Sequence, residues 1–416
     1  MFCDRVALRM TTNGKAQLDW ERIAAHLPVG FRSLAEEMGL LRERPSHMKT
    51  KIRDIGVVLR LVLHQAGTSS SLRATAALAA ATAVVSISAV SLHQWIKKLG
   101  PYLTALLAQM VPTASFAPEK WGGFHVIGGD ATTVQRPGSK GTTARVHYAL
   151  RLADLTPRHI EVTDAHGGET ARRFRAERGE LWLLDRGYAN PAGVAAIRTP
   201  GAHIIVRHNR GSLPLYDKRG KRLDVAALLR GTTGREIARQ RRAFVHFGDE
   251  RIAGRVCWLR IPEDKVAQAR QRATREADGV CDDETLYTAE FVVVFTTVLQ
   301  ELTAAQVLEL YRARWQIELE FKRSKSIREL DRLPNFLPAT IHSWICAKLL
   351  LQLIATRIAS PSEAFPPGEV CFALLGKPEA CEGAHPTPRP RDRRAVVRRK
   401  VGVAPRVRRA SADQRR

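Results

Sequence analysis

The chain has 416 residues, 44% of them apolar, and carries a formal net charge of +25 with a pI of about 10.6. Its length predicts two or three domains with ordinary hydrophobic cores. The excess of Lys and Arg predicts a polyanionic partner, because clustered cations release condensed counterions from a phosphate backbone. Six scattered cysteines exclude a zinc site of the usual spacing, and the best apolar run, residues 344–358, is too short to span a membrane. We therefore expect a soluble cytoplasmic protein.

Residues 1–118 form the first predicted region, which is helical and shows no strand-like alternation. Residues 71–84 and 88–100 are typical of two helices, the second with Ser88 as its N-cap and Gly100 just after its end. Both a helix-turn-helix docked on DNA and an Ala-rich hairpin without a ligand fit this pattern. The sequence alone leaves that choice open.

Residues 119–210 change to β-branched and alternating runs that are broken by Gly and Pro. Three strands are expected first, followed by a helix over residues 169–178 that ends at Gly179. The apolar run 181–185 predicts a buried strand, Pro191 the first turn of another helix, and residues 203–208 a last strand. The order β-β-β-α-β-α-β predicts an α/β fold, a mixed sheet covered by helices on both faces.

Residues 211–300 are predicted to be a β-rich insertion with one charged helix over residues 263–277. Helical periodicity returns in residues 301–360, where Thr303 and Gln306 match a capping box. Residues 361–416 are rich in Pro, Arg, Ala and Gly, and we expect them to be disordered. Within them, residues 389–416 hold 12 Lys and Arg against 2 Asp, so the basic character is shared between this tail and the rest of the chain.

The helix that starts at Thr303 is expected to continue through residues 311–325, YRARWQIELEFKRSK. At 100° per residue, four polar residues fall within about 60° of one another on one face: Tyr311, Arg314, Glu318 and Lys325. Beside them runs an apolar stripe: Leu310, Ile317 and Phe321. Glu320 points to the other side. The face is either a solvated ladder of ion pairs or a carboxylate held beside anion-binding groups.

Two aspartates are candidate partners of Glu318 in a metal site, because metal-assisted phosphoryl chemistry takes two or three carboxylates. Asp185 ends the apolar run LWLLD, and Asp130 ends FHVIGGD; strand ends of this kind are where α/β sheets bind ligands. Each could instead be a plain turn or cap residue. Asp154 and Asp164 are weaker candidates, since their surroundings are typical of turns.

Together these segments resemble the DDE transposases of bacterial insertion sequences, in the group with the YREK signature (insertion sequence family four). That signature is Tyr, two residues, Arg, three residues, Glu, six residues and Lys, and residues 311–325 match every spacing. GGDATTV around Asp130 and LLDRGY around Asp185 resemble its two aspartate segments, with the β-rich insertion between the second Asp and the Glu. The resemblance covers roughly residues 70–358 and does not extend to residues 361–416.

The resemblance implies an RNase H-like mixed sheet flanked by helices, with residues 119–210 and 301–360 as the two parts of the catalytic core. It implies a DNA-binding role for residues 1–118. It further implies two Mg²⁺ ions, or Mn²⁺ in their place, bound by three carboxylates: Asp130, Asp185 and Glu318. It implies DNA contacts from three side chains: Tyr311, Arg314 and Lys325. The partners would be the terminal inverted repeats of the element and the target DNA, bound by a homodimer at the bacterial nucleoid.

The predicted function is a DNA transposase that cleaves the ends of its element and transfers the strands to target DNA by Mg²⁺-dependent transesterification. Two alternatives share the same residues. One is a nuclease on the same core that hydrolyses DNA without joining it. The other is an inactive, transposase-derived DNA-binding protein.

Overall fold

The computed structural model describes residues 8–10, 16–18, 20–41, 52–111, 121–232, 234, 237–277, 281–326, 329–333 and 338–359. The disorder expected for residues 361–416 lies outside these ranges.

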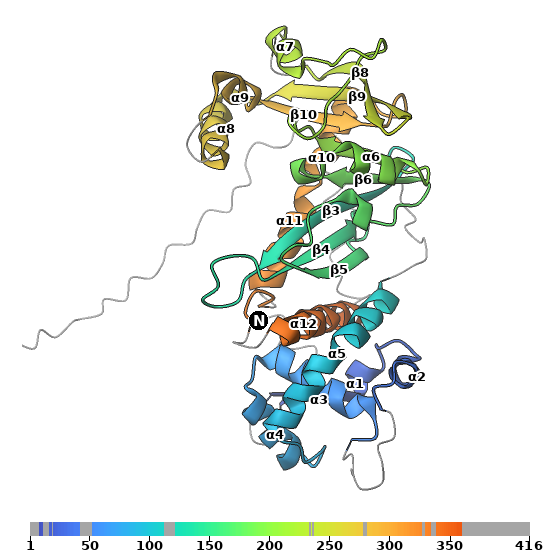
Figure 1. Cartoon of the computed structure of the whole chain (residues 1–416), viewed down its shortest axis with the longest axis vertical. Coiled ribbons are helices and arrows are strands. Elements are labelled where there is room, and N and C mark those ends of the chain that lie inside the picture. Colours follow the sequence, from blue (N-terminus) through green and yellow to red (C-terminus); the bar gives the residue numbers. More distant parts are fainter. Residues whose placement is uncertain are drawn as a thin grey trace, which may run out of the picture. The chain divides into compact units, whose positions relative to one another are not determined.

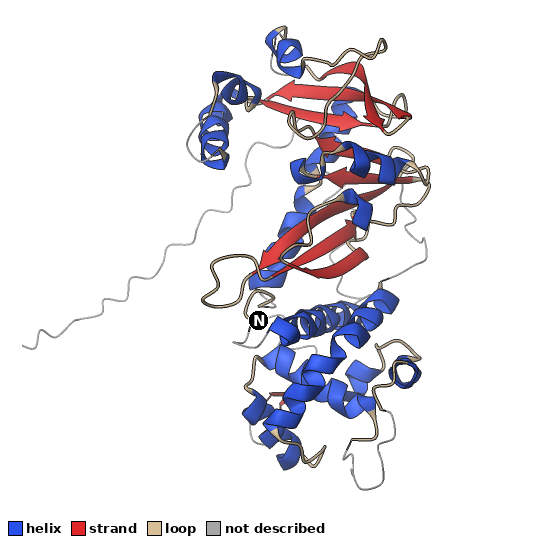
Figure 2. Cartoon of the chain, in the orientation of Figure 1, coloured by secondary structure: helices blue, strands red, loops and turns tan. Residues whose placement is uncertain are grey.

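An eight-stranded mixed sheet organises the described residues between 121 and 300, with the strands in the spatial order β5-β4-β3-β6-β7-β10-β9-β8 (Figure 1, Figure 2). The strands are β3 (His125–Val134), β4 (Ala144–Arg151), β5 (Pro157–Asp164), β6 (Glu180–Leu184), β7 (His203–Arg207), β8 (Arg239–Phe247), β9 (Glu250–Arg260) and β10 (Phe291–Thr296). Strands β3, β6 and β7 pair in parallel, whereas the other pairings are antiparallel. The predicted mixed α/β sheet is confirmed.

Helices cover both faces of this sheet, as predicted. Helix α6 (Pro191–Arg198) shares one hydrophobic core with Trp182 and Leu184, while α10 (Ala304–Arg312) and α11 (Trp315–Ser326) share another with Leu181 and Leu183. Strand β6 therefore buries alternate side chains in two different cores. This double burial explains why its sequence is an unbroken apolar run instead of an alternating one.

The strands of residues 211–300 extend the same sheet instead of forming a sheet of their own. Strand β10 pairs antiparallel with β7, for example Phe295 with Val206, and β9 and β8 follow outward. Three helices accompany them: α7 (Val225–Arg230), α8 (Glu263–Glu276) and α9 (Asp283–Thr288). Helix α8 has no buried residue, which agrees with the charged helix expected there.

A helical core lies beside the sheet. It contains α1 (Trp20–Ala24), α2 (Phe31–Glu37), α3 (Ile55–Thr68), α4 (Leu72–Ala81), α5 (Ala89–Met110) and α12 (Pro338–Ala359). Helix α12 packs along α5 and α3, and it also contacts β5. The N-terminal region is therefore helical as predicted, except for two three-residue strands, β1 (Leu8–Met10) and β2 (Ala16–Leu18), that pair antiparallel. The expectation of no strand was wrong here, because segments this short show no periodicity.

Helix α5 begins as expected but continues past its predicted end. The Ser88 side chain accepts a hydrogen bond from the Ser91 N–H, which confirms the N-cap, yet the helix runs through Gly100 and Pro101 to Met110. A Cβ at Gly100 would lie 3.3 Å from Oγ of Ser343 on α12. Gly100 thus serves the close approach of two helices, and the packing of α5 on α12 outweighs the local stop signal.

The helix predicted over residues 169–178 is reduced to a single 3₁₀ turn, η1 (Ala171–Arg173). Phe174 leaves the helical path to stack on Trp182, with ring centroids 4.9 Å apart, and on Tyr188 at 5.7 Å. Burial of this aromatic ring outweighs the helical propensity of a charged segment.

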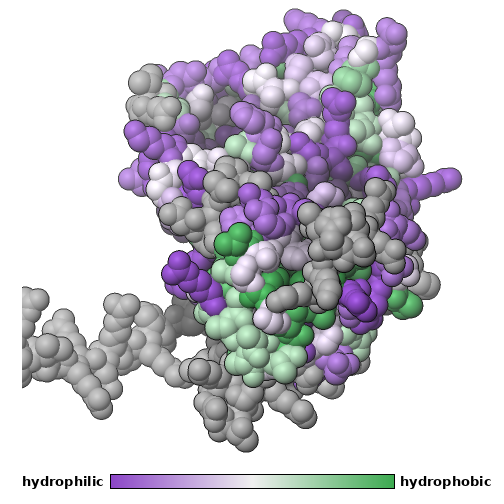
Figure 3. Space-filling model, turned by 60° about the horizontal axis from the view of Figure 1, so that its bottom comes forward, coloured by the Kyte–Doolittle hydropathy of each residue, from purple (hydrophilic) through white to green (hydrophobic). Residues whose placement is uncertain are grey.

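Helix α12 is longer than the apolar run that suggested it. Its stretch Thr340–Ile358 is long and apolar enough to cross a membrane by length and composition, but 67% of that window is buried inside the protein. The contacts with α3 and α5 account for its apolar sequence, as in the core helix of a soluble protein. Figure 3 shows hydrophilic residues over most of the visible surface, with apolar residues gathered in a smaller area.

Replacing Gly100 by Leu should lower the temperature of thermal unfolding, although Leu is the better helix former. The added side chain has no room against Ser343, and overpacking of this kind costs about 1–3 kcal/mol. Val90, on the same helix and 71% exposed, provides the control: Val90→Leu should unfold like the wild type. Equal unfolding temperatures for Gly100→Leu and the wild type would contradict the close-approach explanation.

Candidate active site

The parallel pairing of β3 with β6 brings Asp130 and Asp185 together. The last paired residues are Gly129 and Leu184, so the two aspartates follow at the same level on neighbouring strands, which lie about 4.8 Å apart. Their side chains share the face opposite Leu184, the face that α11 covers. Strand β3 continues to Val134, so the expectation that Asp130 ends its strand was wrong; it is β6 that ends at this level.

Gly129 is needed for this arrangement. A Cβ at that position would lie 2.7 Å from Cδ2 of Leu184 and 3.1 Å from the ring of Phe174. The missing side chain lets the core close on the far face of β3, directly behind Asp130.

Asp130 occupies an environment that disfavours its charge. Burial raises the pKa of its carboxyl to about 7, and the carboxylates of Asp185 and Glu169 act in the same direction. The Ala131 N–H, 2.8 Å from Oδ1, and the Arg314 guanidinium oppose the rise. Burial therefore outweighs the favourable contacts that Asp130 makes with the Ala131 N–H and with Arg314.

Asp185 is both a cap and a member of this group. Its Oδ1 accepts a hydrogen bond of 2.8 Å from the Gly187 N–H at the start of the 3₁₀ turn η2 (Arg186–Tyr188). The capping interpretation left open by the sequence is therefore correct, and it leaves the second carboxylate oxygen available.

The helix that carries Glu318 is not continuous with the one that begins at Thr303. The capping box of Thr303 and Gln306 is confirmed, but α10 ends at Arg312 and α11 starts at Trp315. Bonds of the i to i+3 type, such as the Arg314 N–H to the Tyr311 carbonyl at 3.2 Å, tighten the chain between them. The expectation that one helix continues from Thr303 through residues 311–325 was therefore wrong.

Arg314 lies in that tight link and joins the helix to the sheet. Its Nη1 is 3.4 Å from Oδ2 of Asp130, and its Nη2 pairs with Oε1 of Glu318. The Arg314 side chain is only 14% exposed, whereas that of Glu318 is 47% exposed. A solvated ladder within one helix does not describe this contact, because one arginine connects carboxylates from two different elements.

The other two residues of the predicted face also contact the core. The Lys325 ammonium donates a hydrogen bond of 3.1 Å to the Thr133 carbonyl on β3, and Tyr311 is buried with Arg314 above its ring. The apolar stripe is confirmed by three buried side chains: Leu310, Ile317 and Phe321. Glu320 faces away, as expected, and accepts a hydrogen bond of 2.6 Å from Gln352 of α12.

The two weaker carboxylate candidates hold turns. Asp154 accepts hydrogen bonds from the N–H and hydroxyl of Thr156, and Asp164 accepts them from the N–H groups of His166 and Gly167. Neither contributes to the charge around Asp130 in the way that Asp185 and Glu169 do.

Sequence reasoning missed three charged residues near the site. Glu169 acts on Asp130, Arg207 is largely buried near Asp185, and Arg272 of α8 lies near enough to act with Asp185 and Glu318. Arg207 ends an apolar strand at the same sheet edge as Asp185, which was an available signal. No sequence signal pointed to Arg272, because its position depends on where the extended sheet places α8.

The comparisons with known proteins address the same residues. The transposase DDE domain family matches residues 129–352, more than half of the 416-residue chain. The chain belongs to the DDE transposase family. It is 29% identical over 361 residues to the transposase of insertion sequence element IS421 from Escherichia coli, covering 84% of this chain and 96% of that protein. It is 28% identical over 360 residues to the InsL protein of element IS186A from E. coli strain K12, with the same coverage.

This DDE transposase is therefore an enzyme of a type that cleaves nucleic acid, and its family generally uses divalent metal ions. Among the described residues, no three His, Cys, Asp or Glu side chains lie close enough together to hold one ion. The donor chemistry of the transposase nevertheless suits a divalent cation, because the carboxylates of Asp185 and Glu169 lie near enough to Asp130 to disfavour its negative charge, and carboxylate oxygens are ligands of such cations.

The raised pKa of Asp130 predicts a pH-dependent loss of stability in the metal-free transposase. Because the pKa of Asp130 is about 7 in the folded protein and 3.8 is its ordinary value, ionising Asp130 opposes folding increasingly as the pH rises through this window. Asp130→Asn should therefore unfold at a higher temperature than the wild type above pH 7, and the difference should shrink towards pH 4. Thermal unfolding with a chelator present measures this, and a pH-independent difference would contradict it.

Proposed function

We propose that this protein is an insertion-sequence transposase of the YREK-signature group that cleaves the ends of its own element and joins them to target DNA. The observation that carries the proposal is the meeting of Asp130, Asp185 and the Arg314–Glu318 pair on one face of the sheet. Water would attack a phosphodiester bond at the element end and release a 3′-hydroxyl. That hydroxyl would then attack a phosphodiester bond of the target, joining the element end to the target 5′-phosphate and releasing a 3′-hydroxyl of the target strand.

Asp130, Asp185 and Glu318 are the residues that we propose hold Mg²⁺ or Mn²⁺, as two ions. Such ions activate the attacking oxygen and stabilise the leaving oxygen in phosphoryl transfer. Asp130 and Asp185 are fixed by their strands, whereas Glu318 lies on a helix and its half-exposed side chain is held by Arg314. Glu318 is thus suited to complete the site once its arginine partner contacts the substrate.

Arg314 and Lys325 are the proposed contacts to the DNA backbone. A guanidinium can hold a phosphate with two hydrogen bonds. Arg314 pairs with the carboxylates of Asp130 and Glu318, and bound metal cations would balance the charge of these carboxylates in its place. Tyr311 belongs to the same proposed group, and its burial under Arg314 suits a supporting position more than stacking on a base. We place the reaction in the bacterial cytoplasm, on a homodimer bound to the terminal inverted repeats and the target.

The domain roles follow from the same proposal. Residues 119–210 and 301–360 form the catalytic core, residues 211–300 the insertion, and residues 1–118 the DNA-binding region. Helices α4 and α5 of that region pack on each other, which is compatible with either a helix-turn-helix or a plain hairpin. A strand-transfer assay separates a transposase from a nuclease on the same core, because only the transposase yields joined products.

Replacing Glu318 by Gln should abolish Mg²⁺-dependent cleavage of element ends and leave their binding nearly unchanged. The substitution removes a negative ligand but keeps the shape of the side chain and the neighbouring cations. Cleavage of a labelled end and its mobility shift measure the two properties. The matched control is Glu320→Gln, on the other side of α11, which should cleave nearly as the wild type does. Equal loss in both variants would contradict the assignment.

Replacing Arg314 by Ala should reduce single-turnover cleavage by about a hundredfold or more, because a phosphate misplaced by about 1 Å reacts that much more slowly. The salt dependence of DNA binding should change little, since only one contact is lost. Arg312→Ala is the local control, because Arg312 is 70% exposed and pairs with its neighbour Glu309. Normal cleavage by Arg314→Ala would refute the proposed contact.

Deleting residues 389–416 should affect DNA binding more than cleavage, the reverse of Arg314→Ala, because it removes a net charge of +10 that is remote in sequence from the site. Binding should weaken for all DNA sequences alike and its salt dependence should become shallower, while cleavage at saturating DNA persists.

A further inference from the structure

Glu169 and Asp185 both lie against Gly187, an arrangement that the sequence did not reveal. Its Oε2 lies 2.5 Å from the place that a Cβ would occupy at Gly187. The N–H of the same glycine donates to Asp185. The two carboxylates therefore flank one residue, Gly187, at the turn where β6 ends, and any side chain there would displace Glu169.

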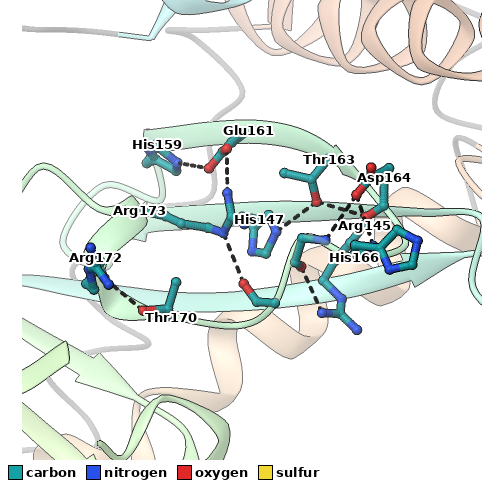
Figure 4. A network of polar contacts seen from close by, with 12 residues as sticks. Arg145, His147, His159, Glu161, Thr163, Asp164, His166, Thr170, Arg172 and Arg173 are labelled. Atoms are coloured by element: carbon teal, nitrogen blue, oxygen red, sulfur yellow. Dashed lines mark hydrogen bonds and ion pairs between the residues drawn. The ribbon is translucent and has the colours of Figure 1, made fainter. Parts of the chain in front are cut away.

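A polar network holds the loop that carries Glu169 (Figure 4). Nη1 of Arg145 on β4 donates a hydrogen bond of 2.9 Å to the Gly167 carbonyl, and Nε of Arg173 donates one of 3.0 Å to the Gly168 carbonyl. Arg173 is fixed in turn by Glu161 on β5, at 2.7 Å. The two peptide groups that precede Glu169 are thus tied to the sheet, so the carboxylate is held near Asp185 by more than its own side chain.

The same loop fits tightly over β5. A Cβ at Gly167 would lie 2.0 Å from Oγ1 of Thr163, a distance that no side chain could tolerate without a shift of the loop. Thr163 also contacts Nε2 of the buried His147 at 3.1 Å. These contacts leave the loop little freedom to carry Glu169 elsewhere.

Two buried donors near Glu169 have no hydrogen-bond partner among the described residues. One is Nε of Arg145, which lies 4.0 Å from Oε1 of Glu169. The other is the hydroxyl of Tyr188, a fully buried side chain on which the charges of Asp130, Asp185 and Glu169 all act. The Arg145 guanidinium is the ionic partner of Glu169, whereas the Tyr188 hydroxyl, which can both donate and accept a hydrogen bond, is open to a polar ligand or a water molecule at this place.

We propose that Glu169 is a fourth carboxylate of the transposase active site, positioned by Arg145, and that it strengthens the binding of divalent cations beside Asp185. This inference rests on the proposed function, since it takes Asp130 and Asp185 as cation ligands. Glu169 would contact the cation directly or through a bound water, and both arrangements use the charge and oxygen atoms of its carboxylate. A purely structural Glu169 would instead serve only to neutralise Arg145.

The test uses the full chain and Mn²⁺ as the probe. Glu169→Gln should weaken Mn²⁺ binding, measured by calorimetry, by about tenfold or more, the loss typical when a supporting group of a metal site is removed. The Mg²⁺ concentration that half-activates cleavage should rise by a similar factor, while cleavage at saturating Mg²⁺ falls much less. Glu177→Gln is the matched control: Glu177 is 59% exposed and pairs with Arg158, away from Gly187.

Gly187→Ala tests the same contact from the other side. Its methyl group would take the place of the Glu169 carboxylate, so Mn²⁺ binding should weaken as it does in Glu169→Gln. The double variant should be no weaker than the stronger-acting single one, because both changes remove the same interaction. Additive losses would mean that Gly187 acts independently of Glu169, and they would count against the proposal.

Asp185→Asn separates the failure of this inference from the failure of the proposed function. Loss of Mn²⁺ binding in Asp185→Asn together with wild-type binding in Glu169→Gln would overturn the role of Glu169 and leave the proposed cation site standing. Wild-type Mn²⁺ binding in Asp185→Asn would overturn the cation site itself. A drop in thermal stability of Glu169→Gln with unchanged Mn²⁺ affinity would show that the carboxylate serves only Arg145.

Discussion

The parallel pairing of β3 with β6 is the constraint on which the rest of the catalytic region depends. It sets Asp130 beside Asp185, and because β6 stops at this level while β3 continues, the two side chains meet where the sheet opens towards α11. The apolar residues of β6 drive this pairing by burying themselves in both cores. The burial of apolar side chains on both faces of β6 thus fixes the position of Asp185 beside Asp130.

The Arg314 link adds the third element to this pair. An arginine that contacts carboxylates of a strand and a helix holds α11 at a defined place on the sheet, and Phe321 packing on Tyr148 holds it from the apolar side. The cost of burying Asp130 is thereby reduced but not removed, since its pKa still lies well above the usual range. A site of this kind is less stable than an apolar one would be, and it is prepared for a ligand that carries positive charge.

Much of the fold could be predicted because the determining signals are local. The continuous apolar run of β6, the cap at Ser88, Pro191 in the first turn of α6 and the capping box at Thr303 each concern a few neighbouring residues. Two of the expectations that were wrong concern contacts between distant segments. Gly100 does not end a helix, because α5 continues through it and packs closely on α12 there. Residues 169–178 do not form a helix, because Phe174 packs in the hydrophobic core against Trp182 of β6.

The site shows the same division. Asp130, Asp185 and Glu318 stand out in the sequence because each follows or interrupts a regular pattern, and the placement of the two aspartates side by side follows from the order of the strands. Glu169 lies within a stretch that has the composition of an ordinary charged helix, so nothing local distinguishes it. Its position near Asp185 depends on hydrogen bonds between Arg145, Arg173 and two peptide carbonyls, which no pattern within one segment can report.

The extension of the sheet by β10, β9 and β8 has a consequence for solubility. The outer strands of this sheet are β5 and β8, and unpaired outer strands invite association with other chains. Two backbone hydrogen bonds between Tyr216 and Phe244 cover part of the outer edge of β8. At one border, β5 contacts α5 and α12. At the other, β8 carries Arg241 and Arg242 as exposed cations. A basic strand that approached β8 would be repelled, and any other strand would have to displace the water bound to these two side chains. The insertion therefore moves the second border of the sheet away from the catalytic residues and places it where Arg side chains discourage aggregation.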